Sequence, residues 1–312
     1  MTPCQAPTRA PTPSPTLRSW LDQAQARHTQ QPAAVAAELA DLAGALPADA
    51  DGVAAIVLAE HVWLGHLADA CGLHNFVARL PGALRVADTT APAVQRAVWA
   101  QALLAGQPVL PLPDALRWRA LQNVLLAMAL QGRSAAALPL LLADEDLAAG
   151  HGSDAAGRAF AATANNLASD LCAGARGDDA RDALMLAAAK LSRRAWGRAG
   201  TPLHVERAEY RLALCHASVG QGAAALQHAH QCLAMCRVLG QPADGAVGLA
   251  AGDTALELFF AHEALVLAHR AGGDAALGRR AQQQMQTLLP AIDEADGMRA
   301  WCVQVLAALA AA

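Results

Sequence analysis

Hydrophobic positions along the chain recur at the three- and four-residue spacing that places them on one face of a helix. Glycine, proline and capping residues interrupt this pattern at short intervals. No stretch alternates apolar and polar residues over the length of a strand. The pattern therefore predicts an all-α protein of about a dozen helices.

Segments of different composition divide the chain. Residues 1–15 are rich in Pro and Thr and bury too little apolar surface to offset ordering, so we predict a disordered tail. Residues 16–106 are predicted to form N-terminal helical hairpins, and residues 113–312 a region of helical repeats. A stiff Pro-rich connector at 108–113 lies between them, and the Gly- and Ala-rich segment 241–252 is predicted to be a flexible loop.

The most informative stretch is Glu206–Met235, which the pattern predicts to be two helices joined by a tight turn. Small residues occur in this stretch where two helices have to approach closely. It resembles the tetratricopeptide repeat (TPR) pattern. The matching positions hold a Leu-Ala pair, a turn glycine and two small residues of the second helix, namely Leu212, Ala213, Gly220, Ala225 and Cys232.

The same spacing recurs, less completely, around Gly132, Gly177 and Gly273. These turn glycines are farther apart than the roughly 34 residues of a regular TPR. Residues 114–289 therefore resemble a degenerate TPR-like repeat, which implies a right-handed α-solenoid of antiparallel helix pairs. Residues 191–301 are similar to bacterial TPR-like proteins of unassigned function, and this likeness implies no particular activity.

The first helix of each pair in a TPR-like stack lines the concave face, where polar side chains can hold a peptide. Asn and Arg suit this role because they can satisfy the backbone groups and carboxylates of a peptide. The resemblance therefore implies a non-enzymatic scaffold that binds a protein or peptide on this face. The implied groove residues are Arg119, Gln122, Asn123, Asn165, Asn166, Arg207 and Tyr210. The competing interpretation of each is an ordinary exposed or capping residue.

A second hypothesis concerns metal binding by one helix face. His228, Cys232 and Cys236 are spaced four residues apart, which places their side chains on the same side of a helix. Imidazole and thiolate are ligands that zinc and copper accept readily. The alternative is helix packing, because His228 and Cys232 also fall at inter-helix positions of the repeat. The scaffold hypothesis itself includes no cofactor.

Another polar cluster lies in the first half of the chain and consists of Glu60, His61, His66, Asp69 and His74. These residues lack the HExxH spacing that places two histidines on one helix face, so we expect a structural or solvent-facing role. The chain also lacks the nucleophile elbow, the phosphate loop and the dinucleotide fingerprint. These observations favour a protein that is not an enzyme.

Composition narrows the choice of partners. The formal net charge of -4 argues against a nucleic-acid partner, since phosphate binding needs a clustered positive surface. No strongly apolar run is long enough to span a membrane, so we expect no membrane partner. The 7 cysteines are scattered and do not indicate a disulfide framework, so we expect a cytoplasmic location.

Two apolar features remain. The C-terminal sequence LAALAAA suggests either a homo-oligomer or burial of this end against the other helices. Five tryptophans lie within apolar helical patterns and are predicted to be core residues. They are Trp63, Trp99, Trp118, Trp196 and Trp301.

Overall fold

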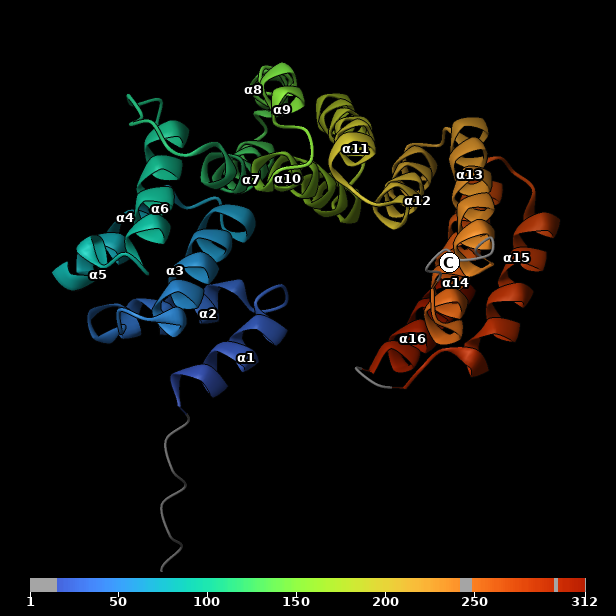
Figure 1. The fold of residues 1–312 in the computed structure, drawn as a ribbon, viewed down its shortest axis with the longest axis horizontal. Coiled ribbons are helices and arrows are strands. Elements are labelled where there is room, and N and C mark those ends of the chain that lie inside the picture. Colours follow the sequence, from blue (N-terminus) through green and yellow to red (C-terminus); the bar gives the residue numbers. More distant parts are fainter. Residues whose placement is uncertain (1–15, 242–248, 295–296, 312) are drawn as a thin grey trace, which may run out of the picture. The chain divides into compact units, whose positions relative to one another are not determined.

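The computed structural model of the chain describes residues 16–241, 249–294 and 297–311. Within these ranges the regular secondary structure is helical and no residue lies in a β-strand, which confirms the predicted all-α class (Figure 1). The predicted tail at 1–15 and most of the predicted loop at 241–252 lie outside the described residues. The chain divides into two compact units, residues 1–101 and residues 102–312.

Six α-helices begin in the described part of the first unit. In chain order they are α1 (Leu17–Arg27), α2 (Pro32–Leu42), α3 (Ala50–Glu60), α4 (Ala70–Arg79), α5 (Gly82–Val86) and α6 (Ala91–Leu104). A 3-10 helix, Ala43–Ala45, follows α2, and a π-helical turn, His61–His66, continues α3. Leu39, Ile56 and Phe76 are among the largest fully buried side chains of this unit.

The π-helical turn corrects the sequence interpretation of this region, which predicts one long helix ended by Gly72. The N–H of Leu67 donates to the carbonyl of Val62, five residues back, at 3.1 Å. Ala68 then has a φ of 50°, in the left-handed region. Asp69 caps a new helix by accepting a 2.9 Å hydrogen bond from the N–H of Gly72. Gly72 therefore lies inside α4 instead of ending the preceding helix.

The described part of the second unit adds ten α-helices. They are α7 (Asp114–Leu130), α8 (Ser134–Leu142), α9 (Glu145–His151), α10 (Ala155–Ala173), α11 (Asp179–Ala199), α12 (Pro202–Ser218), α13 (Gly222–Gly240), α14 (Ala251–Ala271), α15 (Ala275–Leu288) and α16 (Met298–Ala311). From α10 to α15, each helix packs against the next one in the chain, as Figure 1 shows. This succession is consistent with a helical repeat.

The predicted turn glycines have left-handed backbone conformations, with φ values of 71°, 99°, 74° and 79° for Gly132, Gly177, Gly220 and Gly273. Glycine adopts this region at little cost because it has no Cβ. A different requirement applies to Gly222, which begins α13. A Cβ added there would lie 2.5 Å from the backbone nitrogen of Gly272, so α13 starts in direct contact with the end of α14.

The sixteen α-helices of the described residues exceed the predicted dozen because some predicted elements are divided. The sequence predicts one helix from Ser134 to Ala149, whereas the structure has α8 and α9. At the break, the buried Asp144 forms an ion pair with Arg117 of α7, with 2.8 Å between Oδ1 and Nη1. The short helix α5 lies between Pro81 and Pro92, a segment that the sequence predicts to be a loop.

Alanine is prominent in the core of the second unit. Its fully buried alanines include Ala161, Ala164, Ala188, Ala189, Ala213, Ala229, Ala261 and Ala264. Such small side chains allow neighbouring helices to approach closely. Cys302 and Leu309 of α16 are buried in the same hydrophobic cluster as Phe259 of α14. One face of the apolar C-terminal helix thus packs against this unit, while residues such as Val303 remain exposed.

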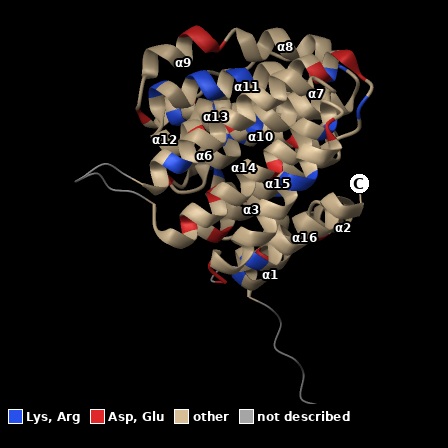
Figure 2. Ribbon diagram, turned by 90° about the vertical axis from the view of Figure 1, so that its right-hand side faces the viewer, with Lys and Arg blue, Asp and Glu red and all other residues tan. Residues whose placement is uncertain are grey.

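Charged residues of both signs are distributed over the helices, with apolar and neutral residues between them (Figure 2). Among the described residues, no helix combines the length and the apolar character needed to cross a membrane.

Candidate binding pocket

A pocket of about 520 Å³ lies in the second unit among side chains of α10, α12, α14 and α16. Helix α12 contributes Glu206, Arg207, Tyr210 and Arg211, which are two pairs of residues four apart and therefore share one face of the helix. The pocket volume falls within the range of about 300–1,000 Å³ that is usual for ligand sites.

One side of the pocket is aromatic. The rings of Tyr210 and Phe260 meet edge to face at 5.8 Å between centroids, and Phe260 contacts Trp301 at 5.0 Å. Trp301 is 46% exposed, although the sequence predicts it to be a core residue. Three adjoining rings form a surface on which an apolar or aromatic side chain can pack.

Two buried carboxylates line another part of the pocket. Glu206 is 1% exposed and Glu257 is 4% exposed. Oε1 of Glu206 accepts hydrogen bonds from the thiols of Cys232, at 2.8 Å, and Cys236, at 3.2 Å. Burial raises the pKa of Glu206 to about 7, and the neighbouring charge of Glu257 adds to this effect. Glu206 can therefore act as hydrogen-bond donor or acceptor near neutral pH.

Arginine and tyrosine side chains complete the polar lining. Nε of Arg207 donates to Oε1 of Glu257 at 3.0 Å, and this hydrogen bond raises the pKa of Arg207. The Arg207 side chain is 58% exposed. The hydroxyl group of Tyr210 donates to Oε2 of Glu263 at 2.7 Å, and burial raises the pKa of both groups. The guanidinium of Arg211 lies 5.8 Å from the centroid of the Tyr210 ring.

Two buried polar atoms of the lining residues have no hydrogen-bond partner among the described residues. They are Oε2 of Glu206 and Nε of Arg211. Most buried polar atoms in proteins have a partner, so each of these atoms needs an explanation. The carboxyl of Glu206 can share a proton with the neighbouring Glu257 through a side-chain hydrogen bond. Because Arg211 lines the pocket, a ligand there could supply the acceptor that its Nε lacks.

The pocket contains three of the predicted groove residues, Asn165, Arg207 and Tyr210. The other four are placed differently. Arg119 and Asn166 are exposed, Gln122 bonds with Asp170 at 3.3 Å, and Asn123 is buried with 5% exposure.

The lining residues of α14 and α16 were missed because these helices do not belong to the clearest repeat, whereas Glu206 of α12 lies in that repeat but was not among the predicted groove residues. Phe260 follows another Phe in an apolar pattern, and Trp301 lies in the strongly apolar last helix. Buried Glu257 gives a stronger signal, because a charged residue within an apolar helix pattern needs a partner when it is buried.

The predicted metal ligands separate into two groups. The ligand atoms of Glu206, Cys232 and Cys236 lie within 4.8 Å of one another, and all three residues are buried. His228 instead bonds through Nδ1 with Oε2 of Glu209 at 2.7 Å. The hydrogen bond with Cys236 and burial raise the pKa of Cys232, so its thiol stays protonated in this arrangement. The pair of thiols therefore contacts a glutamate that the sequence hypothesis does not include.

Comparisons with known proteins assign no family. A scan against protein-family models, a search of curated proteins and a search of solved structures each find no match to the chain. The chemistry of the lining residues is therefore the basis for a functional proposal.

Proposed function

We propose that the second unit is a degenerate TPR-like scaffold, a right-handed solenoid whose concave face contains this pocket, and that it binds a peptide segment of a protein partner without catalysing a reaction. One observation carries the proposal. The buried Nε of Arg211 has no hydrogen-bond partner among the described residues, and it lies in a pocket that also has the buried carboxyl of Glu206 and an aromatic side.

A peptide has the groups that complement this lining. Its amide N–H can donate to Oε2 of Glu206, and its carbonyl can accept from Nε of Arg211. An apolar or aromatic side chain of the peptide can pack against Tyr210, Phe260 and Trp301. Main-chain hydrogen bonds would then provide affinity, and the aromatic surface would select the side chain.

The test is a peptide-display selection against the full-length chain, followed by binding titrations of the selected peptides. Trp301→Ala removes an aromatic residue at the pocket, and an interface residue of this kind contributes about 2 kcal/mol or more. We expect binding to weaken by about 30-fold or more, since 1.4 kcal/mol corresponds to tenfold. Arg211→Met should weaken binding by removing the donor, whereas Arg119→Met should leave it unchanged because Arg119 does not line the pocket.

Thermal melting of each variant separates lost binding from lost folding. The proposal fails if the selected peptides bind wild type and the Trp301→Ala protein equally well. It also fails if Arg119→Met weakens binding as much as Arg211→Met does.

A second candidate function is metal binding by Glu206, Cys232 and Cys236, whose ligand atoms lie within 4.8 Å of one another. Two thiolates and a carboxylate form a ligand set that Zn²⁺ accepts, and binding would require loss of the thiol protons. Titration with Co²⁺ tests this candidate, because thiolate ligands give a charge-transfer absorption band. The band should disappear in the Cys232→Ser and Cys236→Ser variants, and its absence from wild type would exclude the thiolate site.

A further inference from the structure

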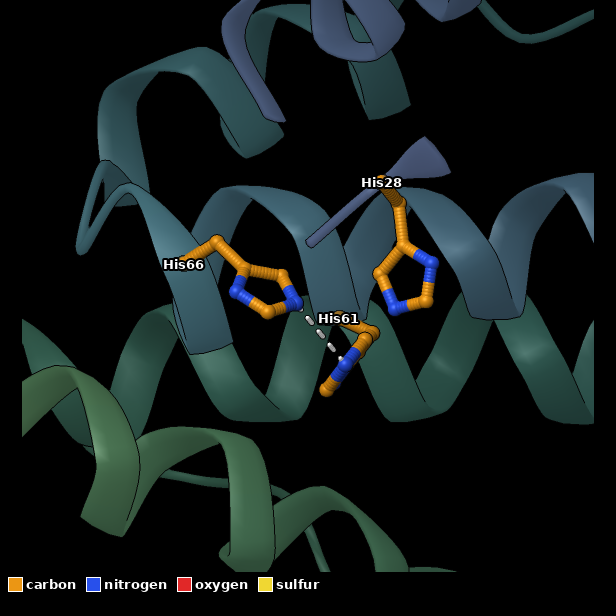
Figure 3. A group of neighbouring side chains, drawn as sticks. All are labelled: His28, His61 and His66. Carbon is orange, nitrogen blue, oxygen red and sulfur yellow. Dashed lines mark hydrogen bonds between the residues drawn. The ribbon is translucent and has the colours of Figure 1, made fainter. Parts of the chain in front are cut away.

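Three histidines of the first unit converge at the junction of α1 and the π-helical turn. His28 follows α1, and His61 and His66 are the first and last residues of the turn. Their candidate ligand nitrogens lie within 4.8 Å of one another. Figure 3 shows the three rings gathered in one place, with a dashed line between His61 and His66. The Nε2 atoms of His61 and His66 are 3.2 Å apart. The ring centroids are 4.7 to 5.3 Å apart.

The π-helical turn brings His61 and His66 together. In an α-helix, residues five apart project in directions that differ by about 140°, since each residue turns the helix by about 100°. A turn closed by a hydrogen bond over five residues has more residues per turn, so its first and last residues approach the same face. Such π turns occur frequently at functional sites.

The hydrogen bond of His28 sets its tautomer. Nδ1 of His28 lies 2.7 Å from the carbonyl oxygen of Gln25, which can only accept, so Nδ1 carries the proton. Nε2 of His28 is then left with a free lone pair. In Figure 3, His28 directs a ring nitrogen toward the side of the cluster where His61 lies. Metal-binding histidines are commonly fixed in this way by a second hydrogen bond from the ring.

We propose that His28, His61 and His66 form a binding site for a divalent transition-metal ion, with Zn²⁺ as the representative. Two nitrogens that each lie about 2.1 Å from a tetrahedral zinc ion are about 3.4 Å apart, close to the observed separation of the His61 and His66 nitrogens. His28 completes the set after a small movement, since all three ligand atoms lie within 4.8 Å of one another. Three imidazole ligands leave a fourth coordination position for water or an exogenous group.

The test uses the full-length protein, stripped of metal with a chelator and then titrated with Zn²⁺ in a calorimeter. His61→Gln and His66→Gln should each weaken the affinity by more than about 100-fold, because even a residue outside the coordination shell alters affinity by about 10–100-fold. The matched control is His74→Gln, which changes an exposed histidine of α4 in the same unit. The control should bind Zn²⁺ as tightly as wild type.

Co²⁺ absorption separates this site from the thiol cluster, because a site with imidazole ligands gives visible bands without a thiolate charge-transfer band. Circular dichroism shows whether each variant folds. If a variant does not fold, imidazole nitrogen NMR spectra of wild type still test the site, since Zn²⁺ should shift the signals of three histidines. The proposal is overturned if wild type binds no Zn²⁺, if His61→Gln and His66→Gln bind it like wild type, or if no histidine signals shift.

Discussion

The buried ion pair between α3 and α6 provides a sharp test of the packing of the first unit. Glu60 is completely buried, and the Arg96 side chain is 9% exposed. Nε of Arg96 donates to Oε2 of Glu60 at 2.6 Å. The substitution Arg96→Met keeps an apolar side chain of similar length but removes the guanidinium. The variant would then hold a buried carboxylate without its cationic partner from α6.

The expected loss of stability follows from the cost of an unpaired buried charge. Removing one partner of a buried ion pair typically destabilises a protein by about 3–5 kcal/mol. Arg96→Met should therefore destabilise the unit by about 3–5 kcal/mol.

Hydrogen exchange measured by mass spectrometry is a suitable assay because it reports on α3 and α6 separately from the second unit. A loss of about 3 kcal/mol corresponds to exchange that is faster by roughly 100-fold. The matched control is Arg18→Met, which breaks the more exposed ion pair between Arg18 and Asp51. An exposed pair contributes about 1 kcal/mol or less, so the control should have a small effect.

A double variant tests the reason for the effect. Glu60→Gln combined with Arg96→Met leaves no charge at the site, so it should recover much of the lost protection. The reasoning is refuted if the double variant exchanges as fast as Arg96→Met alone. It is equally refuted if Arg18→Met accelerates exchange as much as Arg96→Met does.

Two further predictions concern the second unit. A hydrogen bond from Cys215 lowers the pKa of Cys172 to about 6. The rate of alkylation of Cys172 should therefore rise with pH through about 6 and level off at higher pH, because the thiolate is the reactive form. A midpoint near the ordinary thiol value of about 9 would contradict this prediction. Gly222→Ala should lower the free energy of unfolding by about 1–3 kcal/mol in urea denaturation, because the added Cβ meets the backbone of Gly272. Gly150→Ala, whose Cβ would have open space, is the control and should not destabilise the protein.

Much of the helical architecture could be predicted from local sequence. Asp178 accepts hydrogen bonds from the N–H groups at the start of α11, and Pro202 occupies the first position of α12, as these residue types favour. The turn glycines are equally local, since a left-handed φ such as that of Gly220 has a direct signature in the residue type. The break between α8 and α9 involves Asp144 and its partner on another helix, and spacing along one helix does not reveal that contact.

The candidate sites were less accessible to sequence analysis because each depends on packing between helices. The predicted groove set contains Arg207 and Tyr210 but not Trp301, which reaches the pocket from the last helix. The predicted metal set pairs His228 with the two cysteines, whereas Glu206 of α12 contacts both thiols.

The histidine cluster could not be predicted from the sequence for a different reason. Regular α-helical spacing places His61 and His66 on different faces, and only the π-helical turn brings them together. His28 lies in another part of the first unit's sequence, so no spacing rule connects it to the turn.

The alanine-rich core of the second unit has a consequence for how this chain tolerates substitution. In a core of large aliphatic side chains, truncation to alanine is the damaging change because it leaves a cavity. Positions such as Ala164, Ala188 and Ala264 are fully buried and already carry the smallest side chain that suits a helix. The damaging change here is enlargement, since added volume in a well-packed core forces side chains or backbone to shift. A mutational scan of this unit should therefore show a profile in which gain of volume is penalised more than loss of volume.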